Sequence, residues 1–202
     1  MTAPVTGPAN GAGTGAALFG KLPAHGDFVC RRFDAQSQSA IDSWLSESLA
    51  SAQERFANDW RERFDQAAPW LLAGRDEAGW HAGALSPSAD RAGRRFPVFA
   101  QCPAPDGDAA SMLAAAVLEV LYAAIGEGLD ADDVLARLDR LGDPAAPSGL
   151  AQTGEAERLP GSSRWWVTDL EGGIVSEIEG ARPPDLISRM LALLPDGGDD
   201  AA

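Results

Sequence analysis

Only one lysine, two histidines and two cysteines occur among the 202 residues. The imidazole and thiol groups are scattered at positions 25, 30, 81 and 102, which matches no ligand spacing typical of a zinc site. The cysteines form no C-x-x-C pair, so Cys30 and Cys102 are expected to be reduced, small residues of the core. We therefore expect neither a bound metal nor a cofactor.

Long hydrophobic runs are also missing. No uninterrupted apolar run reaches the roughly 18 to 20 residues that a membrane-spanning helix needs, and the most apolar stretch, 112–125, is expected to be a core helix. Residues 1–15 contain no Lys or Arg and no hydrophobic centre, unlike a secretory signal. These absences predict a cytoplasmic protein that does not insert into a membrane.

Basic residues are scarce in the second half of the chain. Residues 1–102 carry 11 acidic and 10 basic side chains, whereas residues 103–202 carry 19 acidic and 6 basic ones, within a net charge of −14. Such a surface repels nucleic acid and anionic membranes, so neither is an expected partner. The acidic excess is either a well-hydrated surface or a face that steers toward a basic partner.

Hydrophobic periodicity predicts one domain over residues 16–195, between disordered tails at 1–15 and 196–202. A long helix is predicted from Ser39, its candidate N-cap, to Phe64, because apolar residues recur there at spacings of three and four. Three more helices are predicted over 109–125, over 131–141 and after Pro183-Pro184, the first two capped by Asp108 and Asp130.

Short apolar runs bounded by turn residues predict strands at 16–20, 70–74, 80–85, 96–102, 164–168 and 173–178. Trp165 and Trp166 are neighbours on one strand and should therefore point to opposite faces, one into the core and the other over a helix or a partner. The predicted order is β-α-β-β-β-α-α-β-β-α. Strands clustered in hairpins favour an α+β fold with a mixed, largely antiparallel sheet flanked by helices.

The segment 20–29, Gly-Lys-Leu-Pro-Ala-His-Gly-Asp-Phe-Val, has an unusual composition. It lacks the G-x-x-x-x-G-K-[ST] pattern of a phosphate-binding loop. A nucleophilic pair of Cys30 with His25 is disfavoured, because Cys30 lies in an apolar, strand-like context. We interpret the segment as a tight turn in which Gly26 takes a positive φ and Asp27 binds backbone donors.

The segment 86–97 places three arginines around one aspartate and two serines, between two predicted strands. Arginine-rich loops bind carboxylate or phosphate groups, which favours a binding role. The alternative is an internal ion pair between Asp90 and an arginine that holds the loop against the sheet. Catalysis by Ser88 is disfavoured, since no G-x-S-x-G motif is present.

Together these stretches resemble the TagF (ImpM) family of type VI secretion accessory proteins. The resemblance rests on Gly20-Lys21-Leu22-Pro23 through Arg31, on the tryptophans of the long helix, on Pro87 through Pro97, and on Ser163 through Gly173. It covers roughly residues 18–190. A PP2C-type phosphatase domain, to which some members of the family are fused, is absent from these 202 residues.

The resemblance implies a non-enzymatic, post-translational repressor of type VI secretion that binds a cytoplasmic component, the forkhead-associated scaffold protein. Two alternatives stay open: a hydrolase using the His25/Asp27 or Ser88/Asp90 loops, and a structural subunit of the apparatus. We expect the segments 20–27 and 86–97 to meet and to form the partner-binding surface. Its candidate residues are Lys21, His25, Asp27, Ser88, Asp90, Arg91, Arg94 and Arg95.

Overall fold

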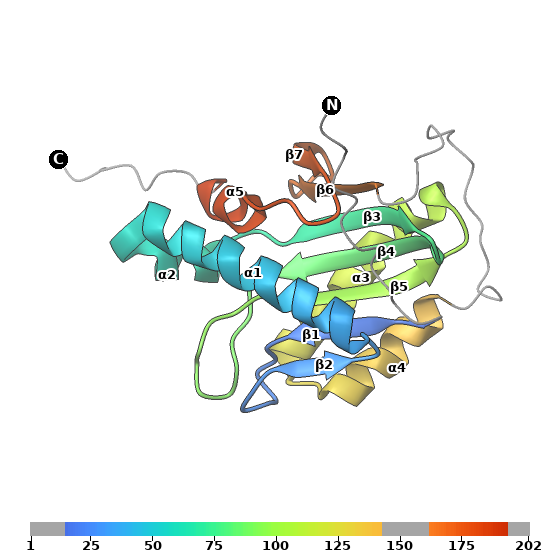
Figure 1. Ribbon diagram of the computed structural model, residues 1–202, viewed down its shortest axis with the longest axis horizontal. Coiled ribbons are helices and arrows are strands. Elements are labelled where there is room, and N and C mark those ends of the chain that lie inside the picture. The colour runs from blue at the N-terminus through green and yellow to red at the C-terminus, as the bar shows by residue number, and fades with distance from the viewer. Residues whose placement is uncertain (1–14, 143–161, 194–202) are drawn as a thin grey trace.

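The computed structural model describes residues 15–142 and 162–193. The two predicted tails and the predicted loop at 143–161 lie outside these residues, apart from Gly15. Figure 1 shows one sheet with helices on both of its faces. The predicted α+β class is confirmed.

The sheet has seven strands in the order β2-β1-β5-β4-β3-β6-β7. Every pair of neighbouring strands is antiparallel, as the clustering of strands into hairpins indicated. The strands are β1 (Ala17–Gly20), β2 (Val29–Arg31), β3 (Trp70–Asp76), β4 (Gly79–Ser86), β5 (Val98–Ala104), β6 (Ser162–Thr168) and β7 (Ile174–Glu179). The prediction omitted β2, a strand too short to show a repeating hydrophobic pattern.

The predicted long helix is two helices. Helix α1 (Ala35–Phe56) begins earlier than predicted because Asp34, rather than Ser39, is its N-cap and accepts a hydrogen bond from the Ser37 amide. It ends at Ala57, whose φ of 44° is incompatible with a continuing helix. A short 3₁₀ segment, η1 (Ala57–Asp59), leads into α2 (Trp60–Gln66).

Helix α3 (Gly107–Glu127) is longer than predicted at both ends. Asp106 caps it in place of Asp108, and Gly128, at φ 69°, ends it in place of Gly126. Helix α4 (Ala131–Leu141) has the predicted bounds, with Asp130 accepting hydrogen bonds from the Asp132 and Asp133 amides. The last helix is α5 (Leu186–Ala192).

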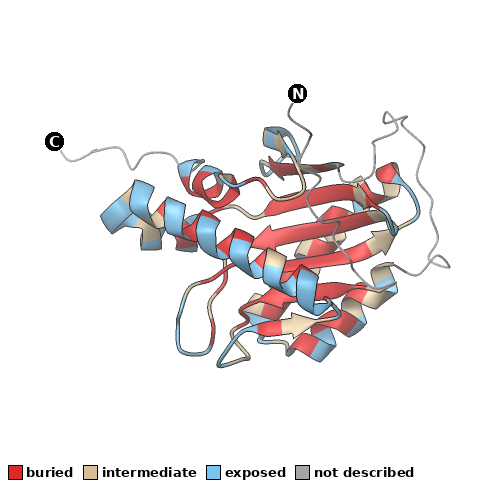
Figure 2. Ribbon diagram, in the orientation of Figure 1, coloured by how far each residue is buried: buried red, intermediate tan, exposed pale blue. Residues whose placement is uncertain are grey.

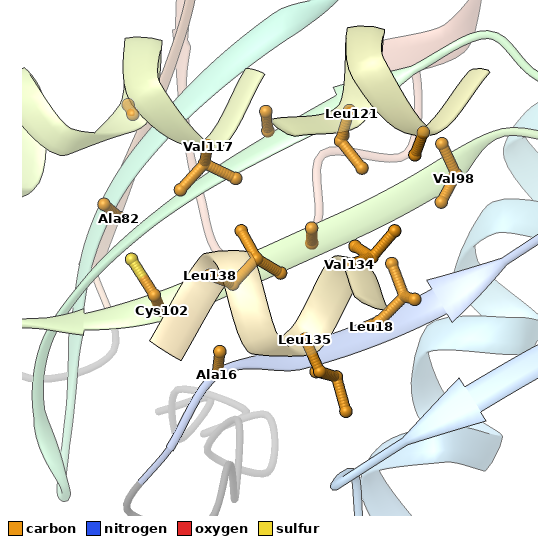
Figure 3. Close-up of a cluster of buried hydrophobic side chains, with 14 of the residues drawn as sticks. Ala16, Leu18, Ala82, Val98, Cys102, Val117, Leu121, Val134, Leu135 and Leu138 are labelled. Carbon is orange, nitrogen blue, oxygen red and sulfur yellow. The ribbon is translucent and has the colours of Figure 1, made fainter. Parts of the chain in front are cut away.

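Two separate cores cover the two faces of the sheet. We call the side of α1, α2 and α5 the aromatic face, because its buried side chains include Phe19, Phe33, Trp44, Phe64, Trp70, Phe96, Phe99 and Trp165. We call the side of α3 and α4 the aliphatic face: its core is built from Ala, Val and Leu with Cys102 and a single buried aromatic residue, Trp166. Figure 2 shows buried residues along the strands (all but the edge strand β7) and on the sheet-facing sides of the helices, and Figure 3 shows part of the aliphatic core.

Trp165 and Trp166 lie on opposite faces, as predicted for neighbours on a strand, and each belongs to one of the two cores. Both are buried, with exposed fractions of 1% and 6%. The Trp165 indole N–H donates to the carbonyl of Gly180 at 3.1 Å. The pair is therefore part of the fold rather than an exposed platform.

Within the described residues, α3 is the one helix whose length and composition would allow it to cross a membrane. The apolar stretch 112–125, expected to be a core helix, is part of this longer helix, which extends from Gly107 to Glu127. In the structure α3 packs against the sheet through Ala110, Ala114, Val117, Leu121 and Ala124, all of which are fully buried.

Candidate functional site

The segment between β4 and β5 is a short, ordered hairpin rather than an open loop. Ala89 and Arg95 form an isolated antiparallel bridge, and the Phe96 amide donates to the carbonyl of Ser88 at 3.0 Å. The Gly93 amide donates to the carbonyl of Asp90 at 2.8 Å, which closes a tight turn at the tip. Gly93 takes a φ of 77°, the left-handed conformation that glycine adopts most readily.

The Asp90 carboxylate holds this hairpin together from inside. Its Oδ1 accepts hydrogen bonds from the amides of Ala92 and Arg94, at 2.9 and 3.0 Å. Its Oδ2 lies 3.0 Å from the Lys21 ammonium and 2.7 Å from Nε of Arg94. Burial alone would raise the pKa of Asp90, but these donors outweigh it and hold that pKa well below its usual value.

The segments 20–27 and 86–97 are in contact, as expected if they form a shared surface. Besides the Lys21–Asp90 pair, the Arg91 amide donates to the carbonyl of His25 at 2.8 Å. The Arg94 guanidinium donates to the carbonyl of Gly26 at 2.6 Å. Figure 1 shows the loop before β2 and the hairpin before β5 side by side below the sheet.

The predicted positive φ of Gly26 is wrong. A Cβ at Gly26 would lie 3.3 Å from the Arg91 guanidinium, so the absence of a side chain allows close approach there rather than an unusual backbone angle. Gly20 takes the positive φ instead, at 130°, and a Cβ there would overlap the carbonyl oxygen of Pro97. Asp27 behaves as predicted, because its Oδ1 accepts a hydrogen bond from the Phe28 amide at 2.9 Å.

We define the two-loop surface as the exposed residues Asp27, Phe28, Arg91 and Arg94. Phe28 is 45% exposed although its ring packs edge-on against Phe96, with centroids 4.7 Å apart. The Lys21 ammonium lies 4.9 Å from the centre of the Phe28 ring, beneath the surface. Cationic and aromatic groups are thus combined on one exposed patch, a composition that is common in the energetic centres of protein interfaces.

Sequence reasoning missed Phe28, the large apolar side chain of this surface. The available signal was an aromatic residue directly after the polar turn His25-Gly26-Asp27. The sequence pattern places such a residue at the start of the next strand, and aromatic residues in strands are usually part of the core. In the structure Phe28 precedes β2, which begins at Val29, and its ring is 45% exposed.

The candidate residues divide into buried and accessible ones. Lys21, Ser88 and Asp90 are buried, with exposed fractions of 6%, 8% and 3%. Asp27 and Arg91 are exposed, and the Arg94 side chain is 59% exposed despite its bond to Asp90. The structure therefore contains both arrangements considered for the 86–97 segment: an internal Asp90–Arg94 ion pair and arginines open to solvent.

His25 and Arg95 tie the margins of the site to two helices. His25 Nε2 accepts the amide hydrogen of Ala131 at 3.0 Å, at the start of α4. Arg95 makes a bidentate pair with Asp65 of α2: Nε donates to Oδ1 at 2.7 Å, and Nη2 donates to Oδ2 at 2.5 Å. Both contacts fix the position of the two-loop surface relative to the rest of the fold.

Two side chains of the hydrolase hypothesis, His25 and Asp90, are engaged in these structural contacts. His25 already accepts a backbone hydrogen, and Asp90 is saturated by Lys21 and Arg94. The Ser88 hydroxyl is buried and has no hydrogen-bond partner among the described residues. No group of three or more His, Cys, Asp or Glu side chains suited to a metal ion occurs in the described ranges.

One further cluster of polar side chains, His81, Ser163 and Asp76, lies on the aromatic face of the sheet. A Cβ at Gly74 would lie 2.5 Å from His81 Nε2 and 2.6 Å from the Ser163 hydroxyl, so both side chains occupy the space above that glycine. His81 Nδ1 is 4.0 Å from Asp76. His81 is 6% and Ser163 is 3% exposed, so this Ser–His–Asp grouping is enclosed by the fold.

Comparison with known proteins decides the family. Residues 17–141, more than half of the chain, match the family described as TagF N-terminal domain, Type VI secretion system-associated. The chain belongs to the TagF family. The matched region contains both loops of the two-loop surface and the buried Lys21–Asp90 pair.

A solved structure shares the fold. The crystal structure of PA0076 from Pseudomonas aeruginosa PAO1 superposes with a TM-score of 0.62 at 20% sequence identity, covering 87% of this chain and 93% of that chain. No curated protein sequence matches the chain. Strands β6 and β7 and helix α5 lie beyond the family match, although β6 and β7 complete the same sheet.

Proposed function

We propose that this TagF protein is a non-catalytic negative regulator of type VI secretion, and that it acts in the cytoplasm by binding a component of the apparatus through the two-loop surface. Membership of a type VI secretion-associated family supports the pathway. The resemblance described above supports repression and the forkhead-associated scaffold protein as the partner.

The choice of surface rests on one observation: the residues around Asp90 are divided into buried ones that hold the loops together and accessible ones. A buried carboxylate and lysine hold two loops together, while Phe28, Arg91 and Arg94 remain accessible. The Arg91 side chain makes no ion pair with any described residue, so its guanidinium is available to a partner's carboxylate or phosphate. A rigid surface loses little conformational entropy on binding, which favours recognition by a preformed site.

The test replaces Arg91 by glutamate in the tagged full-length protein, expressed in its native cells. Arg55→Glu is the matched control, since Arg55 is also exposed and lies at the end of α1. We expect wild type and Arg55→Glu to capture a cytoplasmic component of the secretion apparatus, identified by mass spectrometry. Arg91→Glu should capture at least about tenfold less, because a charge at the centre of an interface is replaced by its opposite.

Secretion itself provides the second readout. Deleting the gene should increase release of a secreted component of the apparatus, and Arg91→Glu should fail to restore repression. Equal capture by both variants would reject the two-loop surface but keep the regulatory role. Constant stoichiometry within purified assembled apparatus would instead favour a structural subunit, and unchanged secretion after deletion would reject repression.

A further inference from the structure

Helix α3 differs from α1 in what it presents to solvent. A helix that covers a sheet normally carries apolar residues on its inner side and polar ones on its outer side. Helix α1 follows this rule, because its exposed residues include Asp42, Glu47 and Glu54. Helix α3 buries an apolar inner side, and Figure 3 shows its Val117 and Leu121 within the aliphatic core. Only 28% of its most apolar 18-residue window is buried, however, so apolar residues also occupy its outer side.

Four exposed residues form one stripe along the outer side of α3. Met112 is 42% exposed and Tyr122 is 47% exposed. Ala115 and Glu119 lie between them in the sequence and are exposed as well. The spacings of three, four and three residues place all four on one side of the helix, as in the contact seam of a two-helix coiled coil. We call these four residues the α3 stripe.

The charges on α3 are all of one sign. The helix contains three carboxylates, Asp108, Glu119 and Glu127, and no lysine, arginine or histidine. Asp108 lies in the first turn, where the helix dipole stabilises a negative charge, and Glu127 is bound by Arg137 at 3.5 Å. Among the described residues none forms an ion pair with Glu119. Partial burial raises the pKa of the Tyr122 phenol and the Glu119 charge adds to the shift, so the two side chains lie within electrostatic reach.

The carboxylate in the middle of the α3 stripe decides which occupant fits. A lipid surface would take up the apolar side chains but leave the Glu119 charge without a counter-charge. A second copy of this chain would bury two Glu119 carboxylates in one seam, and α3 has no cation to balance them. A helix with apolar contact residues and one basic residue opposite Glu119 covers the apolar groups and neutralises the carboxylate. A charged or polar group in such a seam determines the choice of partner.

We propose that the α3 stripe is a docking surface for an amphipathic helix of a partner protein, which packs along Met112 and Tyr122 and places a basic residue opposite Glu119. Ala115, the small residue of the stripe, allows the two helices to approach closely. The partner is then recognised through side chains at helical spacings of three and four residues. The α3 stripe shares no residue with the two-loop surface, and the proposal does not depend on the regulatory role proposed above.

The experiment uses the methionines, of which the chain has three. In full-length protein labelled with carbon-13 at the methionine methyl groups, the NMR signal of Met112 reports on the stripe. Met190 is fully buried on the aromatic face and is the internal control. The probe is a capped helical peptide of the same length as α3, with leucine at spacings of three and four and one lysine at its central contact position. The matched control peptide has glutamate at that position.

We expect the lysine peptide to shift the Met112 signal and to leave the Met190 signal unchanged. It should bind at least about tenfold more tightly than the glutamate peptide, because like charges in one seam repel. In Glu119→Lys this preference should be reversed, since the glutamate peptide then carries the opposite charge. The matched control is Glu47→Lys, which changes the net charge equally at an exposed position of α1 and should bind both peptides as wild type does.

Each of the other outcomes would overturn the proposal. Equal binding of the two peptides to wild type would show that the Glu119 charge does not select the partner. A Met112 signal that shifts with protein concentration in the absence of peptide would identify a second copy as the occupant. A shift caused by phosphatidylcholine vesicles and by neither peptide would identify a lipid surface. No shift of Met112 under any of these conditions would reject the docking surface.

Discussion

The aromatic and aliphatic faces of this sheet bury their helices by different means. On the aliphatic face, alanines of α3 lie against alanines of the central strands, so the helix and sheet approach closely. On the aromatic face, rings from the strands and from α1 fill the layer, as in the contacts of Trp165 with Trp44 and Phe99, whose centroids lie 5.6 and 5.9 Å away. The comparison shows that one face is packed mainly by aromatic rings and the other mainly by Ala, Val and Leu side chains.

The buried polar groups of the sheet also differ between the faces. Trp70 Nε1, both ring nitrogens of His81 and Gln101 Oε1 have no hydrogen-bond partner among the described residues. All three residues share strand faces with members of the aromatic core, as the alternation along β3, β4 and β5 requires. Among the described residues of the strands, the side chains on the aliphatic face include no such group.

The largest effect is expected from Trp165→Ala on the aromatic face. Removing this fully buried indole leaves a cavity between Trp44 and Phe99 and should lower the free energy of unfolding by about 3–5 kcal/mol. Urea denaturation monitored by circular dichroism measures the change. Trp166→Ala, one residue away on the aliphatic face, should lose less, because that indole lies nearer the surface beneath the Arg164 guanidinium. Equal losses would contradict the distinction.

The next effect is expected from Ala114→Leu on the aliphatic face. Ala114 is fully buried in the layer between α3 and the sheet, so added methyl and methylene groups must push the helix outward. We expect a loss of about 1–3 kcal/mol in the free energy of unfolding. The matched control is Ala115→Leu on the exposed side of the same helix, which should stay within about 0.5 kcal/mol of wild type.

A smaller, pH-dependent effect is expected from His81. Burial lowers the pKa of this imidazole from its ordinary 6.5, and attraction by Asp76 offsets only part of the shift. Below pH 6.5 the unfolded chain therefore binds more protons than the native protein, and stability falls as the pH falls. The slope should reach at most about 1.4 kcal/mol per pH unit.

Urea titrations at several pH values between 7.5 and 5, chosen to bracket this window, measure that slope. The variant His81→Gln should show a flatter dependence over the same interval. Asp90 acts in a separate window, because its lowered pKa contributes stability that is lost only as acid protonates carboxylates. An unchanged slope in His81→Gln would assign the effect to another group.

The smallest expected effect concerns chemical reactivity, in which Cys102 should differ from Cys30. Burial raises the pKa of the Cys102 thiol to about 12, and the nearby Asp139 adds to the shift. With native protein at neutral pH, iodoacetamide should therefore leave Cys102 unmodified, whereas denatured protein should react at both cysteines. Mass spectrometry of peptides gives the extent of labelling, and rapid native labelling of Cys102 would show that the aliphatic layer opens.

Local features of the fold could be predicted from the sequence where a single residue marks the boundary of an element. Asp130 and Gly142 bracket α4, and the structure has those bounds. The start of α1 was misplaced because the first apolar residue of its buried face, Ile41, lies well after the true cap Asp34. The division of the long aromatic stripe into α1 and α2 was invisible, since Phe56, Trp60 and Phe64 keep a helical spacing across the break.

The candidate site shows where such reasoning stops. Both segments were recognised from their composition, but nothing in either segment indicates that Lys21 is the partner of Asp90. That contact depends on β1 lying beside β5, a pairing of strands that are distant in sequence. The same long-range pairing decides that Asp90 is buried and Arg91 is exposed, although the two residues are neighbours.

The shared carboxylate of Asp90 also has an evolutionary consequence. The carboxylate contacts one cation from each of two separate motifs, but only its own loss would leave a buried charge unmatched, because the Lys21 ammonium is buried and Arg94 is largely exposed. Positions 21 and 90 should therefore vary together among relatives. A lineage that replaces the acid is expected to have replaced the lysine as well, whereas positions 91 and 94 are expected to vary more freely.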